Sequence, residues 1–262
     1  MNIKSIRLFL VLNTIAFIAM VFVNYLANAL PINGYNTGEV SALYSNYFVP
    51  AGFTFSIWGI IYFFLGLFIV RTLYLYKNDR FNDLSLVSSI SFWFLLSCIT
   101  NALWIYCWHY LQIFYTLVLM LILLYSLMKM YLITRQVQVK GLDYYALSVP
   151  FSIYLAWVSV ATIANFAAFL TDSSWQGLGI HPEIWSVIMI IVACSIGIIM
   201  LLTYADIGFV LVLIWAFFGL YKKASDTSDA FSSDIIAKTA LFSIIVSILA
   251  IFILLYRKRI ET

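Results

Sequence analysis

Residues 144–170 read YYALSVPFSIYLAWVSVATIANFAAFL and contain no Asp, Glu, Lys, Arg or His. An α-helix rises about 1.5 Å per residue, so this stretch would be about 40 Å long as a helix. The hydrocarbon core of a bilayer is roughly 30 Å thick. The stretch therefore predicts a transmembrane helix, and the rest of the chain must be compatible with a membrane.

Four side chains of this stretch share one helical face. Tyr154, Trp157, Ala161 and Asn165 fall at positions i, i+3, i+7 and i+11 of a helix. An amide that faced lipid would leave its donors and acceptors unpaired, which costs a few kcal/mol. We expect this face to point toward a neighbouring helix or a ligand.

The composition indicates an all-α, polytopic membrane protein. Of 262 residues, 65% are hydrophobic and only 10% are charged, too few to cover the surface of a soluble domain of this size. The expected partner of the surface is therefore the lipid bilayer. The net charge of +3 comes from residues in short loops, where it reports topology. We expect no nucleic-acid partner.

Apolar runs predict about eight spans, at residues 6–30, 50–76, 86–108, 111–134, 144–170, 184–204, 207–221 and 235–256. The sixth and seventh are the least distinct. A single helix over residues 184–222 would be about 58 Å long, and Asp206 and Gly208 lie in its middle. Two crossings are therefore expected here, and a seven-span alternative stays open.

The basic residues predict a cytoplasmic N-terminus, in a membrane that we expect to be the bacterial cytoplasmic membrane. With eight spans, Lys222, Lys223 and Lys238 lie outside, and the other eleven basic residues lie on the cytoplasmic side. Those eleven are Lys4, Arg7, Arg71, Lys77, Arg80, Lys129, Arg135, Lys140, Arg257, Lys258 and Arg259. Seven spans would give the same split, so charge does not decide between the two.

Two further stripes pair aromatic rings with polar groups at helical spacing. The second span carries Phe55, Trp58 and Tyr62, and the third carries Asn101 and Trp104, with Trp108 one turn on. Aromatic residues near span ends are expected to be interface anchors, namely Tyr74, Tyr76, Trp108, Tyr110, Trp175, Trp185 and Tyr256.

Trp104 and Trp157 lie well inside their spans, where two interpretations stay open. They either pack helices together or line an apolar cavity. Such a cavity would suit a flat aromatic ligand, because ring faces stack while indole, hydroxyl and amide groups orient the ligand.

The sequence contains few other residues that could form a metal, redox or catalytic site. Three cysteines lie in apolar runs without CxxC spacing, and His109 and His181 lie at predicted turns without ligand-spaced partners, so no disulfide or metal site is expected. Asp206 is expected to be a solvated loop acid, with a proton-coupling residue of an ion-coupled transporter as the alternative. No nucleophile or acid–base pair appears, so we expect a protein that is not an enzyme.

Three motifs resemble the TspO/MBR family, the tryptophan-rich sensory proteins that include the mitochondrial translocator protein. Residues 150–165, with Pro150, Tyr154, Trp157 and Asn165, are similar to its fifth-helix motif. Asn101-x2-Trp104 with Trp108 resembles its third-helix motif, and residues 50–62 resemble the segment that enters its second helix. The motifs occur in the family's order across about residues 6–170.

The resemblance implies a five-helix bundle over residues 1–170, with about three added helices over 171–262. It also implies a pocket for tetrapyrroles such as porphyrin or haem, or for cholesterol in some members, lined by Trp58, Trp157 and Ala161. The chain departs from the family at Gly52, where many members have Trp, and at Ser56, where they have Pro.

These observations predict an integral membrane protein that binds a hydrophobic, tetrapyrrole-like aromatic molecule as a transporter or sensor. The alternative is a structural or assembly subunit whose aromatic stripes only pack helices, and association of two copies of the chain stays open. The candidate ligand-binding residues are Phe55, Trp58, Tyr62, Asn101, Trp104, Tyr154, Trp157, Ala161 and Asn165.

Overall fold

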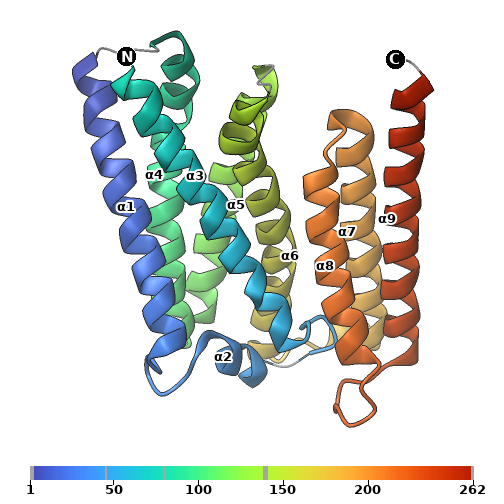
Figure 1. The fold of residues 1–262 in the computed structure, drawn as a ribbon. Coiled ribbons are helices and arrows are strands. Elements are labelled where there is room, and N and C mark those ends of the chain that lie inside the picture. Colours follow the sequence, from blue (N-terminus) through green and yellow to red (C-terminus); the bar gives the residue numbers. More distant parts are fainter. Residues whose placement is uncertain (1–2, 45, 79–80, 138–140, 261–262) are drawn as a thin grey trace. The chain divides into compact units, whose positions relative to one another are not determined.

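The computed structural model describes residues 3–44, 46–78, 81–137 and 141–260, which form helices and contain no strand (Figure 1). The elements, in order, are α1 (Ile3–Ala29), α2 (Thr37–Leu43), the 3₁₀ segment η1 (Gly52–Ser56), α3 (Ile57–Lys77), α4 (Phe81–His109), α5 (Ile113–Gln136), the π-helical turn η2 (Tyr144–Ser148), α6 (Val149–Asp172), the 3₁₀ turn η3 (Gly177–Gly179), α7 (Pro182–Tyr204), α8 (Ile207–Ala224) and α9 (Asp234–Ile260). The all-α fold is confirmed.

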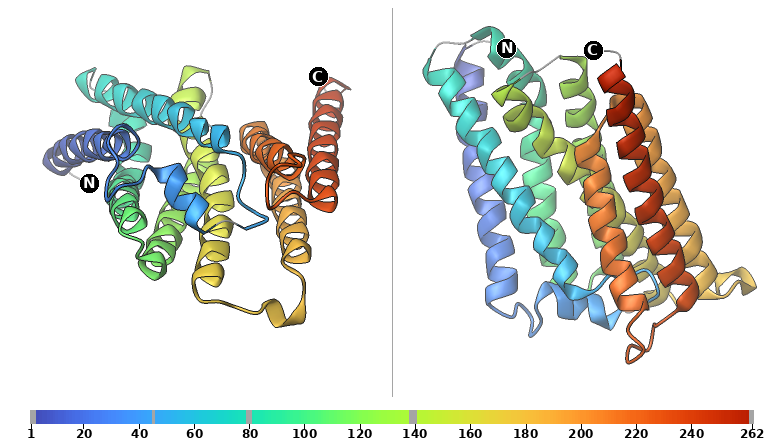
Figure 2. Two further views of the ribbon diagram at one scale, coloured as in Figure 1. Left: turned by 90° about the horizontal axis from the view of Figure 1, so that it is seen from below. Right: turned by 45° about the vertical axis from the view of Figure 1, so that its right-hand side comes forward.

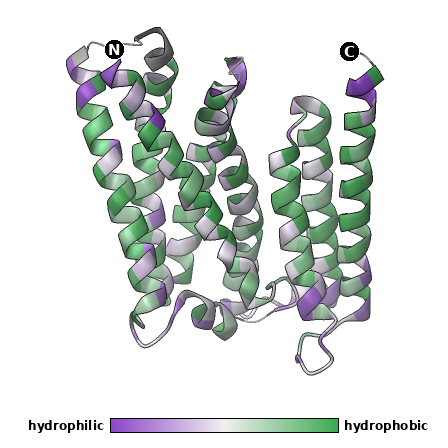
Figure 3. Cartoon of the chain, viewed as in Figure 1, coloured by the Kyte–Doolittle hydropathy of each residue, from purple (hydrophilic) through white to green (hydrophobic). Residues whose placement is uncertain are grey.

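Eight helical segments of the described residues are long and apolar enough to cross a membrane. Figure 3 shows apolar residues along these segments and polar residues mainly at helix ends and in loops. α7 and α8 are separate helices, so the prediction of two helices after residue 184 is confirmed, and each is long and apolar enough to cross a membrane. The predicted cytoplasmic residues Arg80 and Lys140 lie outside the described residues.

The chain divides into two compact units, which are described separately. The first contains residues 1–40 and 57–158, and the second contains residues 41–56 and 159–262. The first unit therefore includes α1, α3, α4, α5 and the start of α6, while the second includes η1, the rest of α6 and α7–α9. The division expected at residue 170 stays a prediction.

In the first unit, α4 packs against α1, α3 and α5. Three rings from three helices fill the centre: Phe68 of α3 lies 4.8 Å from Phe94 of α4 and 5.0 Å from Phe151 of α6, measured between ring centroids. All three rings are fully buried. By contrast, Leu8, Ile15 and Phe22 of α1 are more than half exposed, as expected of side chains that face lipid.

The predicted fifth span begins with a widened turn instead of a regular α-helix. Residues 144–148 are π-helical, and the Val149 N–H donates to the Tyr144 carbonyl, five residues back. Pro150 explains this locally, because it has no N–H and its ring collides with the carbonyl four residues earlier. At the same end, Arg71 of α3 forms an ion pair with Asp143.

The end of α4 is buried against Asn33 of the loop before α2 and Thr37 at the start of α2, which corrects one prediction. Trp108 was expected at the membrane interface, but it is buried and its indole N–H donates to the Thr37 carbonyl at 3.2 Å. His109 was expected at a turn; its ring is also buried, and Nε2 lies 3.1 Å from Thr37 Oγ1. Asn33 donates to the His109 carbonyl, so the loop satisfies groups that the helix end leaves unpaired.

In the second unit, α7, α8 and α9 pack side by side, as both views of Figure 2 show. Asp206 lies at the sharp turn between α7 and α8, where Ala205 has a left-handed φ of +51°. The prediction of a solvated acid is wrong, since Asp206 is buried and accepts a hydrogen bond from the Phe209 N–H at 3.1 Å. Its carboxylate caps α8, where the helix dipole favours negative charge.

The short segment η1 is packed directly on α8. The Ala51 N–H donates to the Gly219 carbonyl at 3.1 Å, and the Trp215 indole donates to the Thr54 carbonyl at 2.9 Å. Phe53 makes edge contacts with the rings of Trp215 and Phe218. These bonds hold Thr54, which is fully buried, against the backbone of α8.

Candidate functional site

Four aromatic side chains of the first unit form one cluster, which we call the Trp58 cluster: Trp58, Tyr62, Tyr154 and Trp157. Trp58 begins α3 and stacks on Tyr62 one turn later, with ring centroids 5.6 Å apart and planes 19° apart. Tyr154 and Trp157 approach from α6 in edge-to-face geometry, with ring centroids 5.8 Å and 6.2 Å from that of Trp58. The helices of the second and fifth spans therefore meet at these rings.

A chain of hydrogen bonds fixes the position of Tyr154. Asn101 of α4 donates through Nδ2 to the Tyr154 hydroxyl at 2.9 Å, and Asn24 of α1 donates to Asn101 Oδ1 at 2.7 Å. Asn24 also donates to the Met20 carbonyl of its own helix at 2.9 Å. All three side chains in this chain are at most 5% exposed. The polar groups of three helices are thus satisfied inside the apolar bundle.

The Tyr62 hydroxyl differs from the Tyr154 hydroxyl in its hydrogen bonding. The Tyr62 oxygen is buried, and no hydrogen-bond partner reaches it within the described residues. A buried hydroxyl without a partner costs about 1–3 kcal/mol, so such groups call for an explanation. The Trp58 cluster therefore offers ring faces together with one hydroxyl that has unused hydrogen-bonding capacity.

The structure brings together only some of the predicted site residues. Trp104 stacks with Trp108, at 5.7 Å and 18°, one turn further along α4. Phe55, Ala161 and Asn165 belong to the second unit, and their place in the predicted pocket stays a prediction. The Asn165 amide donates to the Ala161 carbonyl of its own helix at 3.0 Å.

Phe55, Trp58 and Tyr62 do not belong to one continuous α-helix. Their predicted stripe assumed such a helix, but η1 is a 3₁₀ segment and α3 starts at Ile57. A 3₁₀ helix has three residues per turn, so the helical face changes at this junction. Phe55 is consequently held in the segment that packs on α8, while Trp58 and Tyr62 keep their common face.

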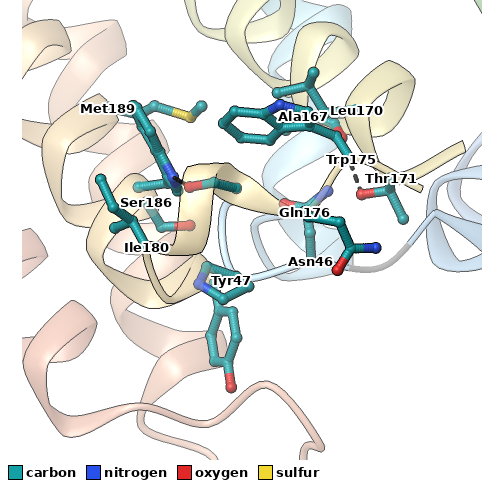
Figure 4. Close-up of a pocket in the computed structure, with 13 residues that line it drawn as sticks. Asn46, Tyr47, Ala167, Leu170, Thr171, Trp175, Gln176, Ile180, Ser186 and Met189 are labelled. Carbon is teal, nitrogen blue, oxygen red and sulfur yellow. Dashed lines mark hydrogen bonds between the residues drawn. The ribbon is translucent and has the colours of Figure 1, made fainter. Parts of the chain in front are cut away.

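The second unit contains a cavity of about 290 Å³ that the sequence did not indicate (Figure 4). It lies where α6 ends and α7 begins, under the loop that joins them. The described lining residues are Asn46, Tyr47, Ala167, Leu170, Thr171, Trp175, Gln176, Gly177, Ile180, Pro182, Trp185, Ser186 and Met189. We refer to this site as the α6–α7 cavity.

Two tryptophans of this cavity were predicted to be interface anchors. Their rings lie against each other, with centroids 5.4 Å apart and planes tilted by 54°. Trp175 is 40% exposed, and the role of the pair as anchors stays a prediction. The Trp185 indole donates to the Gly177 carbonyl at 3.0 Å, and Gly177 has a φ of +64° that suits glycine. The recurrence of Trp on both sides of a Gly-Leu-Gly loop is the sequence signal that could have drawn attention to this site.

Within the described residues, no group of three or more His, Cys, Asp or Glu side chains is positioned to hold a metal ion.

Eight apolar helices among the described residues define a polytopic α-helical membrane protein, in which an aromatic cluster joins two of them. A family model described as TSPO-like protein matches residues 10–253. The chain therefore belongs to the TSPO-like protein family, which confirms the resemblance seen in three sequence motifs. The matched region includes α7, α8 and most of α9, so it also covers the helices expected to be an addition. Comparisons with curated proteins and with solved structures gave no match.

Proposed function

We propose that this protein binds a flat, hydrophobic aromatic molecule of the tetrapyrrole class at the Trp58 cluster, as a transporter or sensor without catalytic activity. One observation carries the proposal: Trp58 and Trp157, the two positions that the family resemblance assigns to the pocket, contact each other inside the first unit. Their helices could have placed these rings toward lipid. Trp157 is only 2% exposed.

The chemistry of the cluster fits such a ligand. The faces of two indoles and two phenols provide stacking surfaces, which favour planar aromatic rings. The Tyr62 hydroxyl can donate to a ring substituent or accept from a pyrrole N–H. The cluster contains no histidine, and its two phenols are the side chains that could ligate a haem iron, so both a metal-free porphyrin and haem fit the class.

A packing role is the second candidate, and the ring contacts themselves favour it. Tyr154 and Trp157 are almost completely buried and touch Trp58 edge to face, as aromatic side chains do in protein cores. In that case the rings only hold α3 and α6 together. The two functions differ in one measurable respect, because a packing cluster does not change its environment when a porphyrin is added.

Protoporphyrin titration of the purified full chain in lipid nanodiscs tests the proposal. We expect saturable quenching of tryptophan fluorescence, and a Kd at least about tenfold higher for Trp157→Phe, because the smaller ring loses stacking area and the indole N–H. Trp93→Phe is the matched control, since Trp93 lies on α4 of the same unit and contacts Tyr125. Its Kd should stay within about twofold of the parent value.

The thermal unfolding temperature of both variants separates binding from folding. A Trp157→Phe protein that melts like the Trp93→Phe control but binds more weakly supports the binding role. Equal affinity in all three proteins, or quenching that never saturates, would leave the packing role as the better account.

We also propose that the N-terminus faces the cytoplasm. Lys4 and Arg7 lie at the start of α1, and Arg257, Lys258 and Arg259 lie at the end of α9, which eight crossings place on the same side. A cysteine introduced at Ser5 should be protected from a membrane-impermeant maleimide in intact cells, and one introduced at Ser228 should be labelled. The reverse labelling pattern would refute this orientation.

A further inference from the structure

The α6–α7 cavity is lined by both apolar and polar side chains. In Figure 4, Met189, Ile180 and Ser186 lie on one side, and Leu170, Thr171 and Gln176 lie on the other. We call the side with Thr171 and Gln176 the polar side. The Gln176 amide uses one N–H to hold the Ser174 carbonyl at 3.1 Å, and a carboxamide can form up to four hydrogen bonds. The polar side therefore has capacity left for a bound molecule.

The two tryptophans of the cavity are held in place by the protein itself. An interface anchor points its indole N–H at lipid headgroups or water. The Trp185 N–H instead donates to the Gly177 carbonyl, in the loop between α6 and α7, and the Trp185 ring lies against Trp175. Met189, which lines the same space from α7, adds a polarizable thioether that suits contact with an aromatic ring.

Charge restricts what this space can hold. None of the described lining residues is Asp, Glu, Lys, Arg or His. An ionised ligand would gain no counter-ion from these side chains, and the part of it that the cavity encloses would lose its hydration, which is unfavourable. The lining consequently favours a neutral molecule.

Size restricts it further. Ligand pockets usually have volumes of roughly 300–1,000 Å³. The α6–α7 cavity, at about 290 Å³, lies at the lower limit of that range and is too small to enclose a tetrapyrrole. Its ligand is therefore different from the one proposed for the Trp58 cluster.

We propose that the α6–α7 cavity is a second binding site, for a small uncharged amphipathic molecule of about one or two rings. The apolar part of the ligand lies against Trp175, Trp185 and Met189, and a hydroxyl, amide or N–H group bonds to Gln176 or Thr171. The site does not depend on the Trp58 cluster.

Fluoroindole is a suitable probe, because it is flat and neutral and carries one N–H donor. Its binding to the full chain in nanodiscs is followed by fluorine NMR, with empty nanodiscs as the reference for partition into lipid. Met189→Trp fills the cavity and should raise the Kd at least about tenfold. Ile191→Trp adds a similar bulk at an exposed position of the same helix and should leave the Kd unchanged.

Two further comparisons make the result decisive. Trp157→Phe should bind fluoroindole like the parent chain, so failure at one site is distinguishable from failure at the other. A fluoroindole carboxylate should bind at least about tenfold more weakly than the neutral probe. Equal binding by Met189→Trp and Ile191→Trp, or equal binding of the neutral and anionic probes, would overturn the proposal.

Discussion

Gly219→Ala is expected to lower the free energy of unfolding by about 2–3 kcal/mol, the cost of forcing extra atoms into a packed interior. A Cβ at this position would overlap Thr54 Oγ1 and lie 2.9 Å from Thr54 Cγ2. Neither side can move easily, because backbone and indole hydrogen bonds tie the residues around Thr54 to α8. The measurement is reversible unfolding of the purified chain in mixed detergent.

The structure offers both a rescue and a control for this prediction. The Thr54 hydroxyl oxygen is buried and has no hydrogen-bond partner in the described part of the chain, so Thr54→Ala alone should cost little. Combined with Gly219→Ala it should recover part of the loss, because the Oγ1 and Cγ2 contacts disappear while Thr54 Cβ still lies 3.0 Å from the added Cβ; a double-mutant cycle measures this recovery as coupling. Gly59→Ala, where a Cβ would meet nothing within 4 Å, should be nearly neutral. If Gly59→Ala and Gly219→Ala behave alike, η1 is not packed on α8 as described.

Asn101→Leu is expected to cost about 1–2 kcal/mol, even though it makes the bundle more apolar. Asn101 is fully buried, and its amide joins Asn24 of α1 to the Tyr154 hydroxyl of α6. Removing it leaves the Tyr154 hydroxyl without its donor in an apolar interior, where no water replaces it. Steric trapping or unfolding in mixed micelles measures this loss.

Replacing Asn24, Asn101 and Tyr154 together shows whether the stability loss comes from unsatisfied hydrogen bonds or from the changed shape of the side chains. In Asn24→Leu/Asn101→Leu/Tyr154→Phe no buried partner is left unsatisfied, so the protein should be more stable than Asn101→Leu alone. Asn28→Leu is the control for adding an apolar side chain to α1, because Asn28 is exposed and its amide donates to the Asn24 carbonyl of its own helix. A triple variant less stable than the single one would show that the three groups do not form a chain.

The sequence predicted the helices well because membrane spans are dictated by length and apolar composition. The charge-free stretch of residues 144–170 became the segment Tyr144–Asp172, and the weakly separated sixth and seventh spans proved to be distinct helices. Helical spacing also placed Trp58 next to Tyr62, and Tyr154 next to Trp157, on common faces.

Loops and helix junctions could not be predicted in this way, because their contacts join residues far apart in sequence. Trp108 was placed at the membrane interface, yet it is buried against Thr37, and the His109 ring is buried against the same residue. Asp206 was placed in solvent, yet it caps a buried helix end. The interruption of the aromatic stripe at Phe55 follows from a 3₁₀ segment that periodicity alone cannot reveal.

The central claim is that the Trp58 cluster receives a planar ligand, and a structure of the chain saturated with protoporphyrin in nanodiscs tests it most directly. We predict planar density in contact with the rings of Trp58 and Trp157, with a ring substituent or pyrrole nitrogen within hydrogen-bonding distance of the Tyr62 hydroxyl. Porphyrin density found only elsewhere, with the 6.2 Å contact between Trp58 and Trp157 unchanged, would contradict the claim and assign these rings to packing.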